Sequence, residues 1–200
     1  MNQEKPESTQ PEFWSQRYAS GRTPWRLDHV PAQLKRFIES LAARSRVLIP
    51  GCGEDNQTVD AFFRAGHKVT AIDFSPIAVS RLRKSLPALR EEIILGDFFH
   101  HTFESDPFDV VYERTFLCSL PPRMWKSYAK RVAQLLRPEG MLAGFFFYGE
   151  ETDPPPFPLD DSTADKVFGE FFVMRTSEPV PDSLPVFGGR EKWQEWQLPS

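Results

Sequence analysis

The sequence predicts one α/β domain built on an open, mostly parallel β-sheet. Short apolar segments alternate with segments of helical periodicity between residues 30 and 140, which is the pattern of successive βαβ units. A glycine turn, Gly51-Cys52-Gly53, joins the first apolar segment to the helix after it. The segment 141–148 is apolar throughout, as expected of a strand in the middle of a sheet that is covered on both faces.

The elements of the first half follow from periodicity and from the residues that begin and end helices. Asp55 or Asn56 is expected to cap one helix and Gly66 to end it. Ser75 is expected to cap the next, with Pro76 at its first helical position. The expected order is a helix over 30–43, a strand over 46–50, a helix over 56–65, a strand over 68–72 and a helix that begins at 76.

The second half continues the alternation. Pro138 and Gly140 are expected to stop a helix, because proline and glycine both interrupt helical hydrogen bonding. The expected elements are strands over 92–95 and 108–112, a helix over 122–136, the strand over 141–148, a helix over 161–169 and two late strands over 171–174 and 192–198. No internal repeat or second domain is visible.

The N-terminal region differs in composition from the rest. Residues 1–11 are polar and are expected to form a disordered arm, followed by one domain over 12–200. Trp14, Tyr18 and Trp25 lie close together in the first part of that domain.

Composition excludes several classes of protein. The net charge of -4 leaves no basic patch, so we expect no nucleic-acid partner. No apolar stretch approaches the roughly 20 residues that span a bilayer, and no signal peptide is visible, so we expect no membrane association. The only two cysteines, Cys52 and Cys118, suit a reducing compartment, and we expect a cytoplasmic protein. No coiled-coil or other interface pattern is present, which makes a monomer the simpler expectation.

Candidate ligand-binding residues fall at the ends of three successive strands. Gly51 and Gly53 follow the first strand, and without β-carbons they permit close approach of a ligand. Asp73 ends the second strand and can accept hydrogen bonds from a ribose diol, as in other nucleoside-binding βαβ units. After the third strand, Asp97 can accept from an adenine amine and Phe98 offers a ring face. The alternative is that Asp73 and Asp97 are ordinary turn acids.

The glycine turn lacks the third glycine of the dinucleotide-binding G-x-G-x-x-G motif. Glu54 and Asp55 stand there instead, and two carboxylates at a helix N-terminus would repel a pyrophosphate. The sequence therefore favours a nucleoside without phosphates, and S-adenosylmethionine (SAM) is the candidate cofactor. No Cys, His or acid spacing completes a metal site, although His100 and His101 are adjacent.

These residues lie in segments that resemble the thiopurine S-methyltransferase family, which includes thiol and halide methyltransferases. The N-terminal aromatic segment and the Pro-Pro-Phe segment are its specific features. The resemblance implies a Rossmann-like class I methyltransferase fold with a seven-stranded, mostly parallel sheet, helices on both faces and an N-terminal aromatic lid. The matching segments are EFWSQRYASGRTPW (12–25), the glycine-turn unit (46–79), GDFF (96–99), the segment 108–140, PPPFPL (154–159) and GREKWQEWQL (189–198).

The resemblance also implies roles for single residues. Cofactor-covering aromatics are matched by Trp14, Tyr18 and Trp25, with Trp25 also near the substrate. Gly51 matches a position in the turn after the first strand. Asp73 matches the acid that binds the ribose, and Asp97 with Phe98 matches the pair that binds the adenine. A simple hydrophobic flap is the alternative for the tryptophans.

Arg114 matches an arginine that faces the methyl acceptor in family members. We expect it to stabilise an anionic acceptor or its thiolate electrostatically. The alternative is a structural ion pair with Glu113 or Asp109. Glu12 is a further candidate, as a proton acceptor for a thiol, although an exposed acid is commonly just solvated.

The predicted function is SAM-dependent methyl transfer to a small acceptor through sulfur, as in a thiol or thiopurine-like molecule, with selenium, tellurium and halide as further acceptors. One alternative is a SAM-binding sensor or partner module without catalysis. A less favoured alternative is an NAD-dependent oxidoreductase.

Overall fold

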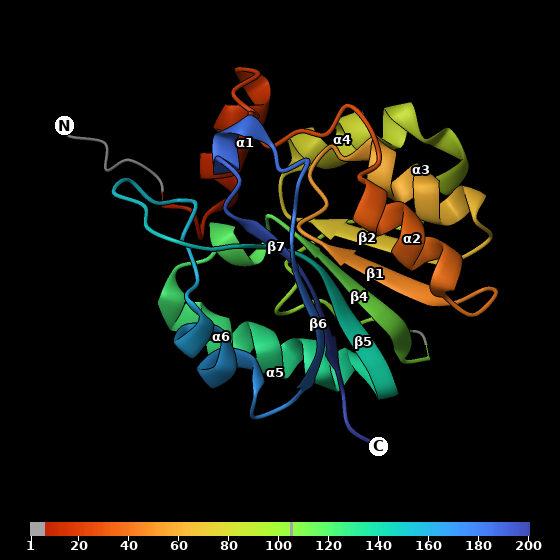
Figure 1. Ribbon diagram of the computed structural model, residues 1–200. Coiled ribbons are helices and arrows are strands. Elements are labelled where there is room, and N and C mark those ends of the chain that lie inside the picture. The colour runs from red at the N-terminus through yellow and green to blue at the C-terminus, as the bar shows by residue number, and fades with distance from the viewer. Residues whose placement is uncertain (1–6, 105) are drawn as a thin grey trace.

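A computed structural model of the chain describes residues 7–104 and 106–200. Seven strands form one sheet in the order β3-β2-β1-β4-β5-β7-β6 (Figure 1). The strands are β1 (Arg46–Pro50), β2 (Lys68–Asp73), β3 (Ile93–Leu95), β4 (Phe108–Arg114), β5 (Leu136–Phe147), β6 (Val173–Pro179) and β7 (Glu191–Gln197). The α-helices are α1 (Pro11–Ala19), α2 (Ala32–Ser40), α3 (Asn56–Arg64), α4 (Pro76–Ser85), α5 (Trp125–Leu135) and α6 (Asp161–Phe168). The predicted α/β fold class is confirmed.

The order in which the chain adds strands to the sheet reverses between β1 and β4, and this point matters for ligand binding. Strands β3, β2, β1, β4 and β5 are parallel, and β7 runs antiparallel to both β5 and β6. Val47 of β1 pairs with Val69 of β2 on one side and with Val110 of β4 on the other. The chain therefore winds outward in opposite directions from β1 and β4. Ligands in such sheets bind beyond the carboxyl ends of the strands at this switch point.

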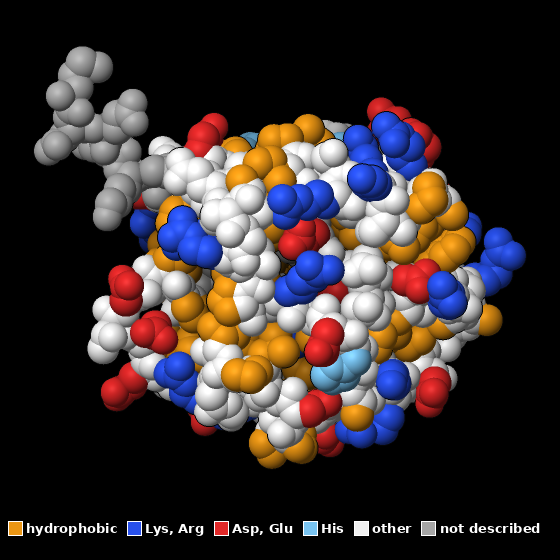
Figure 2. Space-filling model, turned by 90° about the horizontal axis from the view of Figure 1, so that it is seen from above, with side chains coloured by type: hydrophobic (Ala, Val, Ile, Leu, Met, Phe, Trp, Pro, Cys, Tyr) orange, Lys and Arg blue, Asp and Glu red, His pale blue; other side chains and the backbone are white. Residues whose placement is uncertain are grey.

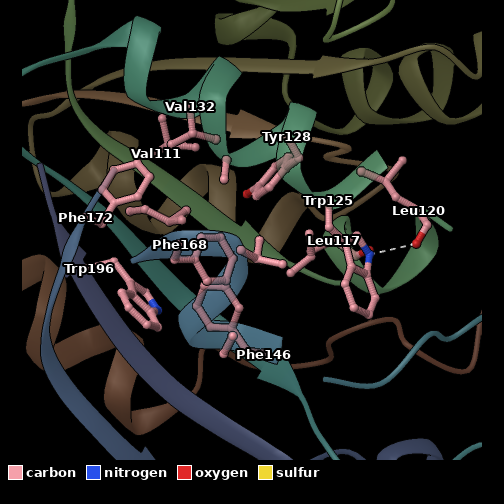
Figure 3. Close-up of a cluster of buried hydrophobic side chains, with 14 of the residues drawn as sticks. Val111, Leu117, Leu120, Trp125, Tyr128, Val132, Phe146, Phe168, Phe172 and Trp196 are labelled. Atoms are coloured by element: carbon pink, nitrogen blue, oxygen red, sulfur yellow. Dashed lines mark hydrogen bonds between the residues drawn. The ribbon is translucent and has the colours of Figure 1, made fainter. Parts of the chain in front are cut away.

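Two apolar cores hold helices against the two faces of the sheet. One core joins α5 and α6 to the sheet, and Figure 3 shows the Phe146, Phe168 and Trp196 rings packed together in it. At its edge the Trp125 indole donates to the Leu120 carbonyl at 2.9 Å. The other core covers the opposite face with side chains from α2, α3 and α4. Helices on both faces keep the sheet rigid, so its strand ends present ligand-binding residues at fixed positions.

Local signals placed several elements correctly. Strand β1 has the predicted bounds, and the Ser75 hydroxyl accepts a hydrogen bond from the Ala78 N–H at the start of α4. Asp55 caps α3 through the N–H of Thr58 at 3.0 Å.

Other boundaries differ from the prediction. The predicted helix over 122–136 is a short 3-10 turn, Pro122–Met124, followed by α5. Helix α5 ends before Pro138 and Gly140, and both lie inside β5, which starts at Leu136. Glu139 takes a positive φ of 62°, which turns the backbone between these two residues.

The predicted strand over 171–174 is also displaced. The observed β6 begins at Val173 and continues to Pro179. It is an edge strand with mostly exposed side chains, so burial imposes no apolar alternation that periodicity could detect.

The predicted disordered arm needs correction where it can be described. Residues 1–6 lie outside the described part of the chain. Residues 7–10 form a turn, and Pro11 is the first residue of α1, which periodicity did not predict. Ser8 is buried, and its carbonyl accepts a hydrogen bond from the Trp14 indole at 2.8 Å. The arm therefore packs against the domain from residue 7 onward.

The surface above α1 and α4 carries mixed charge. Figure 2 shows Lys and Arg side chains interspersed with Asp and Glu side chains and with apolar groups over this face. Within residues 7–104 and 106–200, no helix has the length and apolar character needed to cross a bilayer.

Candidate active site

A cavity of about 350 Å³ lies at the carboxyl ends of the parallel strands. Residues from four strand ends line its floor: Gly51 after β1, Asp73 at the end of β2, Gly96 after β3 and Thr115 after β4. Helix α1, the segments that follow β3 and β4, and the loops around Pro155 and Phe187 line much of the rest. The cavity therefore occupies the place that the sheet topology indicates.

Both the backbone conformation and the neighbouring side chains require glycine at the two ends of the turn. Gly51 and Gly53 adopt φ values of 59° and 54°, in the left-handed region that favours glycine. A β-carbon at Gly51 would overlap the ring of Phe116, and one at Gly53 would overlap the Tyr18 hydroxyl. Gly51 lines the main cavity and Gly53 lines a small neighbouring one. The turn thus joins the floor of the cavity to its lid.

Asp73 is buried at the floor with both carboxylate oxygens engaged by the backbone. Its Oδ2 accepts from the Gly53 N–H at 2.9 Å and its Oδ1 from the Ser75 N–H at 2.7 Å. Burial raises the pKa of Asp73 to about 6, while these two hydrogen bonds act in the opposite direction. Each oxygen keeps acceptor capacity for a ligand hydroxyl. The position fits the predicted ribose acid.

Asp97 and Phe98 both line the cavity, with different degrees of exposure. The Asp97 side chain is 45% exposed, and its oxygens meet the Phe99 N–H at 2.8 Å and His100 Nδ1 at 2.7 Å. Phe98 is only 3% exposed and packs edge-on against Phe99 and Phe116. Most of the Phe98 ring therefore belongs to the core, and little of it is free for an adenine ring.

The predicted aromatic lid forms over the cavity. Trp14 and Tyr18 lie on α1, and each meets Trp25 edge-to-face, with ring centroids 5.6 and 6.3 Å apart. All three line the cavity. The lid is anchored on α4, because Ser15 and Ser75 share a hydrogen bond of 2.9 Å and Arg81 donates to the Tyr18 carbonyl at 2.7 Å. Whether these rings contact the cofactor stays a prediction.

The charge argument from Glu54 and Asp55 needs correction. Asp55 is engaged as the cap of α3. Glu54 pairs with Arg81 at 3.1 Å and with Arg26 at 3.9 Å, so its negative charge is compensated locally. The predicted repulsion of a pyrophosphate is therefore much weaker than the sequence alone suggested.

Arg114 lies beside the main cavity and does not line it. It lines the small cavity of about 40 Å³, together with Tyr18, Trp25 and Gly53. Its Nη1 is 3.5 Å from Oε1 of buried Glu191, and its guanidinium lies 4.7 Å from the centre of the Phe145 ring. Arg114 thus has a structural ion pair, but its partner is neither Glu113 nor Asp109.

Glu113 instead holds the loop after β4. Its Oε1 accepts from the N–H groups of Phe116 and Leu117 at 2.9 and 2.8 Å, and its Oε2 accepts from the Tyr128 hydroxyl at 2.6 Å. Burial raises the pKa of Glu113 to about 7, and these hydrogen bonds oppose the rise. The loop that Glu113 fixes supplies Thr115 and Phe116 to the cavity. Periodicity gave no signal for this role.

Several cavity residues were not predicted. Most of them come from loops and from the lid, where no strand end marks a position: Arg17, Arg22, Phe99, Phe116, Pro155, Pro156, Val186 and Phe187. Phe74 follows the end of β2 directly and was also missed. Cys118 also lines the cavity, and burial raises the pKa of its thiol far above the usual range. Glu12, considered as a base, is exposed and does not line it. In the part of the chain that the structure describes, no group of three His, Cys, Asp or Glu side chains could hold a metal ion.

The sheet order and the cavity at its switch point define the class I methyltransferase fold. The N1-methyltransferase for 1,6-didemethyltoxoflavin from Burkholderia thailandensis, solved with S-adenosylhomocysteine, shares this fold. Its TM-score is 0.76 at 19% identity, covering 95% of this chain and 87% of that chain. The family model described as thiopurine S-methyltransferase matches residues 9–196, and the chain belongs to that family.

Two curated relatives show how far the similarity extends. A thiopurine S-methyltransferase of Vibrio cholerae is 31% identical over 179 residues, covering 79% of this chain and 80% of the relative. A probable thiol methyltransferase of Arabidopsis thaliana is 29% identical over 159 residues, covering 77% and 70%. The chain is thus a SAM-dependent methyltransferase, and the oxidoreductase alternative has no support.

The residues present fit SAM as the cofactor. Asp73 offers a buried carboxylate at the floor, and the left-handed glycine turn holds that carboxylate through the Gly53 N–H. The aromatic rings of the lid suit a sulfonium cation, since a cation over an aromatic face gains roughly 0.5–2 kcal/mol.

Proposed function

We propose that the enzyme methylates the sulfur of a small thiol, working as a monomer in the cytoplasm. The observation that carries this proposal is the cavity itself, which has an acidic floor for the nucleoside and a mostly apolar remainder under an aromatic lid. The names of the relatives, which include thiol, thiopurine and thiocyanate methyltransferases, support a small sulfur acceptor. Two free, buried cysteines are consistent with a reducing compartment.

Methyl transfer to a thiolate needs little acid-base catalysis by the protein. When bound, SAM supplies an electrophilic methyl group, which passes to the acceptor sulfur in line while the electron pair of the breaking bond stays on the cofactor sulfur. Among the described residues that line the cavity there is no histidine, and the two acids, Asp73 and Asp97, belong to the nucleoside end. We therefore expect the acceptor to react as a thiolate that forms before the transfer.

The chain contributes positioning and exclusion of water. Trp14, Tyr18 and Trp25 cover the cavity, which keeps water away from the reacting methyl group. The loop held by Glu113 fixes one wall. Holding two reactants in line converts a bimolecular step into an effectively unimolecular one, and this alignment supplies most of the acceleration.

A labelling experiment tests the function. The full chain is incubated with SAM labelled in its methyl group and with thiophenol, a selenol or iodide, and the methylated products are measured. We expect labelled methyl phenyl sulfide at a rate well above the reaction without enzyme. Calorimetry with SAM and with NAD runs in parallel. Binding of SAM without any methylated product would favour the non-catalytic sensor and contradict the proposal.

Arg114 should influence turnover beyond its structural ion pair. Arg114→Met leaves Glu191 buried without its cation, and breaking a buried pair typically costs about 3–5 kcal/mol. The double variant Arg114→Met/Glu191→Gln removes that unpaired charge and should recover most of the lost melting temperature. We expect kcat for thiophenol to stay at least tenfold low in the double variant, with SAM affinity near wild type.

The outcome separates two roles of Arg114. If turnover recovers together with the melting temperature, the arginine only forms the buried ion pair with Glu191 across the sheet. If SAM affinity falls in step with turnover, Arg114 serves the cofactor and not the acceptor.

A further inference from the structure

Two arginines face the main cavity from the lid. Arg17 lies on α1 and Arg22 in the loop that follows it. The Arg17 guanidinium stacks on the Phe13 ring at 3.5 Å, and Arg22 donates from Nε to the Ser20 hydroxyl at 3.1 Å. Within the described part of the chain, neither guanidinium has an acidic partner within 4.0 Å. Both therefore keep donor capacity for a ligand.

Electrostatics makes this pair a site for an anion. Burial and then the positive charge of Arg22 lower the pKa of Arg17, and the attraction of Asp153 opposes this from beyond contact distance. Both side chains also line the same cavity, so two positive charges meet there without a neutralising acid in contact among the residues that the structure describes. An anion bound in this part of the cavity would compensate these charges and could accept charge-assisted hydrogen bonds.

The remaining lining of the cavity limits the kind of molecule that can carry the anionic group. The acids of the cavity are Asp73, which ends β2, and Asp97, which follows β3, and they mark the nucleoside end. The wall that completes the other end is largely apolar and rigid, with Pro155, Pro156 and Phe187. Space for a second molecule between this wall and the lid therefore suits an apolar body that carries a negative charge.

The position of the arginines indicates which part of the acceptor they meet. Arg22 is exposed and Arg17 is half-buried, so the pair lies toward solvent. The reacting sulfur has to reach the cofactor over the strand ends, at the floor of the cavity. The arginines would therefore meet a second, outer group of the acceptor.

We infer that Arg17 and Arg22 bind an acidic substituent of the methyl acceptor, so that the preferred acceptors are thiols with a carboxylate on an apolar body. This inference rests on the proposed function and adds a substrate class to it. It also makes the two arginines determinants of specificity, because a guanidinium pair discriminates a carboxylate from its neutral isostere.

A matched pair of acceptors tests the inference. The probes are 4-mercaptobenzoate and 4-mercaptobenzamide, which differ in the charge of the outer group. For the wild-type enzyme we expect kcat/KM to be at least tenfold higher for the benzoate, mainly through KM. In Arg17→Met/Arg22→Met this preference, measured as the ratio of the two kcat/KM values, should fall to about twofold or less.

Two further variants sharpen the test. Arg22→Glu alone changes an exposed side chain, so it should fold, and it should reverse the preference toward 4-(aminomethyl)thiophenol. Arg64→Met, which removes an arginine that pairs with Asp60 on α3, is the matched control and should keep the preference for the benzoate.

The possible results distinguish the inference from the proposed function. Methylation of both thiols with equal efficiency by the wild type, or an unchanged preference in the double variant, overturns the inference alone. A loss of S-adenosylhomocysteine affinity in the double variant, with the preference unchanged, assigns the arginines to the cofactor and also overturns it. Absence of product from either thiol with the wild type overturns the proposed function, and the inference with it.

Discussion

Gly144→Ala is expected to lower the free energy of unfolding by about 3 kcal/mol or more, the upper range for overpacking a rigid interior. Gly144 lies in β5 between two partners, Glu113 of β4 and Gln194 of β7. A β-carbon at this position would overlap the carbonyl oxygen of Glu113 and lie 2.7 Å from its carbonyl carbon. Backbone atoms cannot rotate away as a side chain can, so the strands themselves would have to separate.

The damage should extend to the active site. Glu113 caps the loop that supplies Thr115 and Phe116 to the cavity, and Arg114 is the next residue. A displaced β4 would therefore weaken ligand binding as well as stability. Urea unfolding followed by circular dichroism measures the first effect, and SAM titration of the folded fraction measures the second.

Gly96→Ala is the matched control for stability. An added β-carbon there would meet its nearest neighbours at 3.5 Å, which is ordinary contact, so the unfolding midpoint should shift little. Equal midpoints for wild type and Gly144→Ala would contradict the close approach of β4 and β5.

The elements that sequence predicted well are those specified by local physics. Strand β1 is a short buried apolar run. Ser75 and Pro76 begin a helix, because the serine hydroxyl accepts an N–H of the first turn and proline has no N–H that needs a partner. Asp73 and Asp97 were predicted to share one cavity because parallel strands bring their carboxyl ends to one edge of the sheet.

The elements that sequence missed depend on tertiary contacts. Helix α1 has weak amphipathicity, and it is held by Ser75 and Arg81 from another helix. The partner of Arg114 is Glu191, from a strand at the far end of the chain, so neighbouring acids were the wrong candidates. The positions of Arg17 and Arg22 in the sequence give no sign that both side chains line one cavity.

Asp73→Asn is expected to weaken SAM binding by roughly 1.5–3 kcal/mol, the scale of hydrogen bonds to a charged group. Both oxygens of Asp73 accept backbone N–H groups, from Gly53 and Ser75. An asparagine must turn its amide N–H₂ toward one of these donors, so it loses the charge and also places donor against donor. Calorimetry with S-adenosylhomocysteine measures the loss of affinity without turnover.

The pH dependence of binding tests the same residue independently. Burial raises the pKa of Asp73 to about 6 in the free protein. Ribose hydroxyls donate to the carboxylate, so binding favours the deprotonated form and releases a proton wherever Asp73 is protonated beforehand. Affinity should therefore be level above pH 6 and fall as the pH drops below it, by up to tenfold per unit.

The two experiments together assign the effect to one carboxyl group. In Asp73→Asn the affinity should be low at every pH and the fall below pH 6 should disappear, because asparagine does not titrate. Asp60→Asn, which removes a carboxylate paired with Arg64 on α3, should keep both the wild-type affinity and the wild-type pH profile. If the fall below pH 6 persists in Asp73→Asn, another group is responsible, and the buried carboxylate at the end of β2 does not hold the ribose.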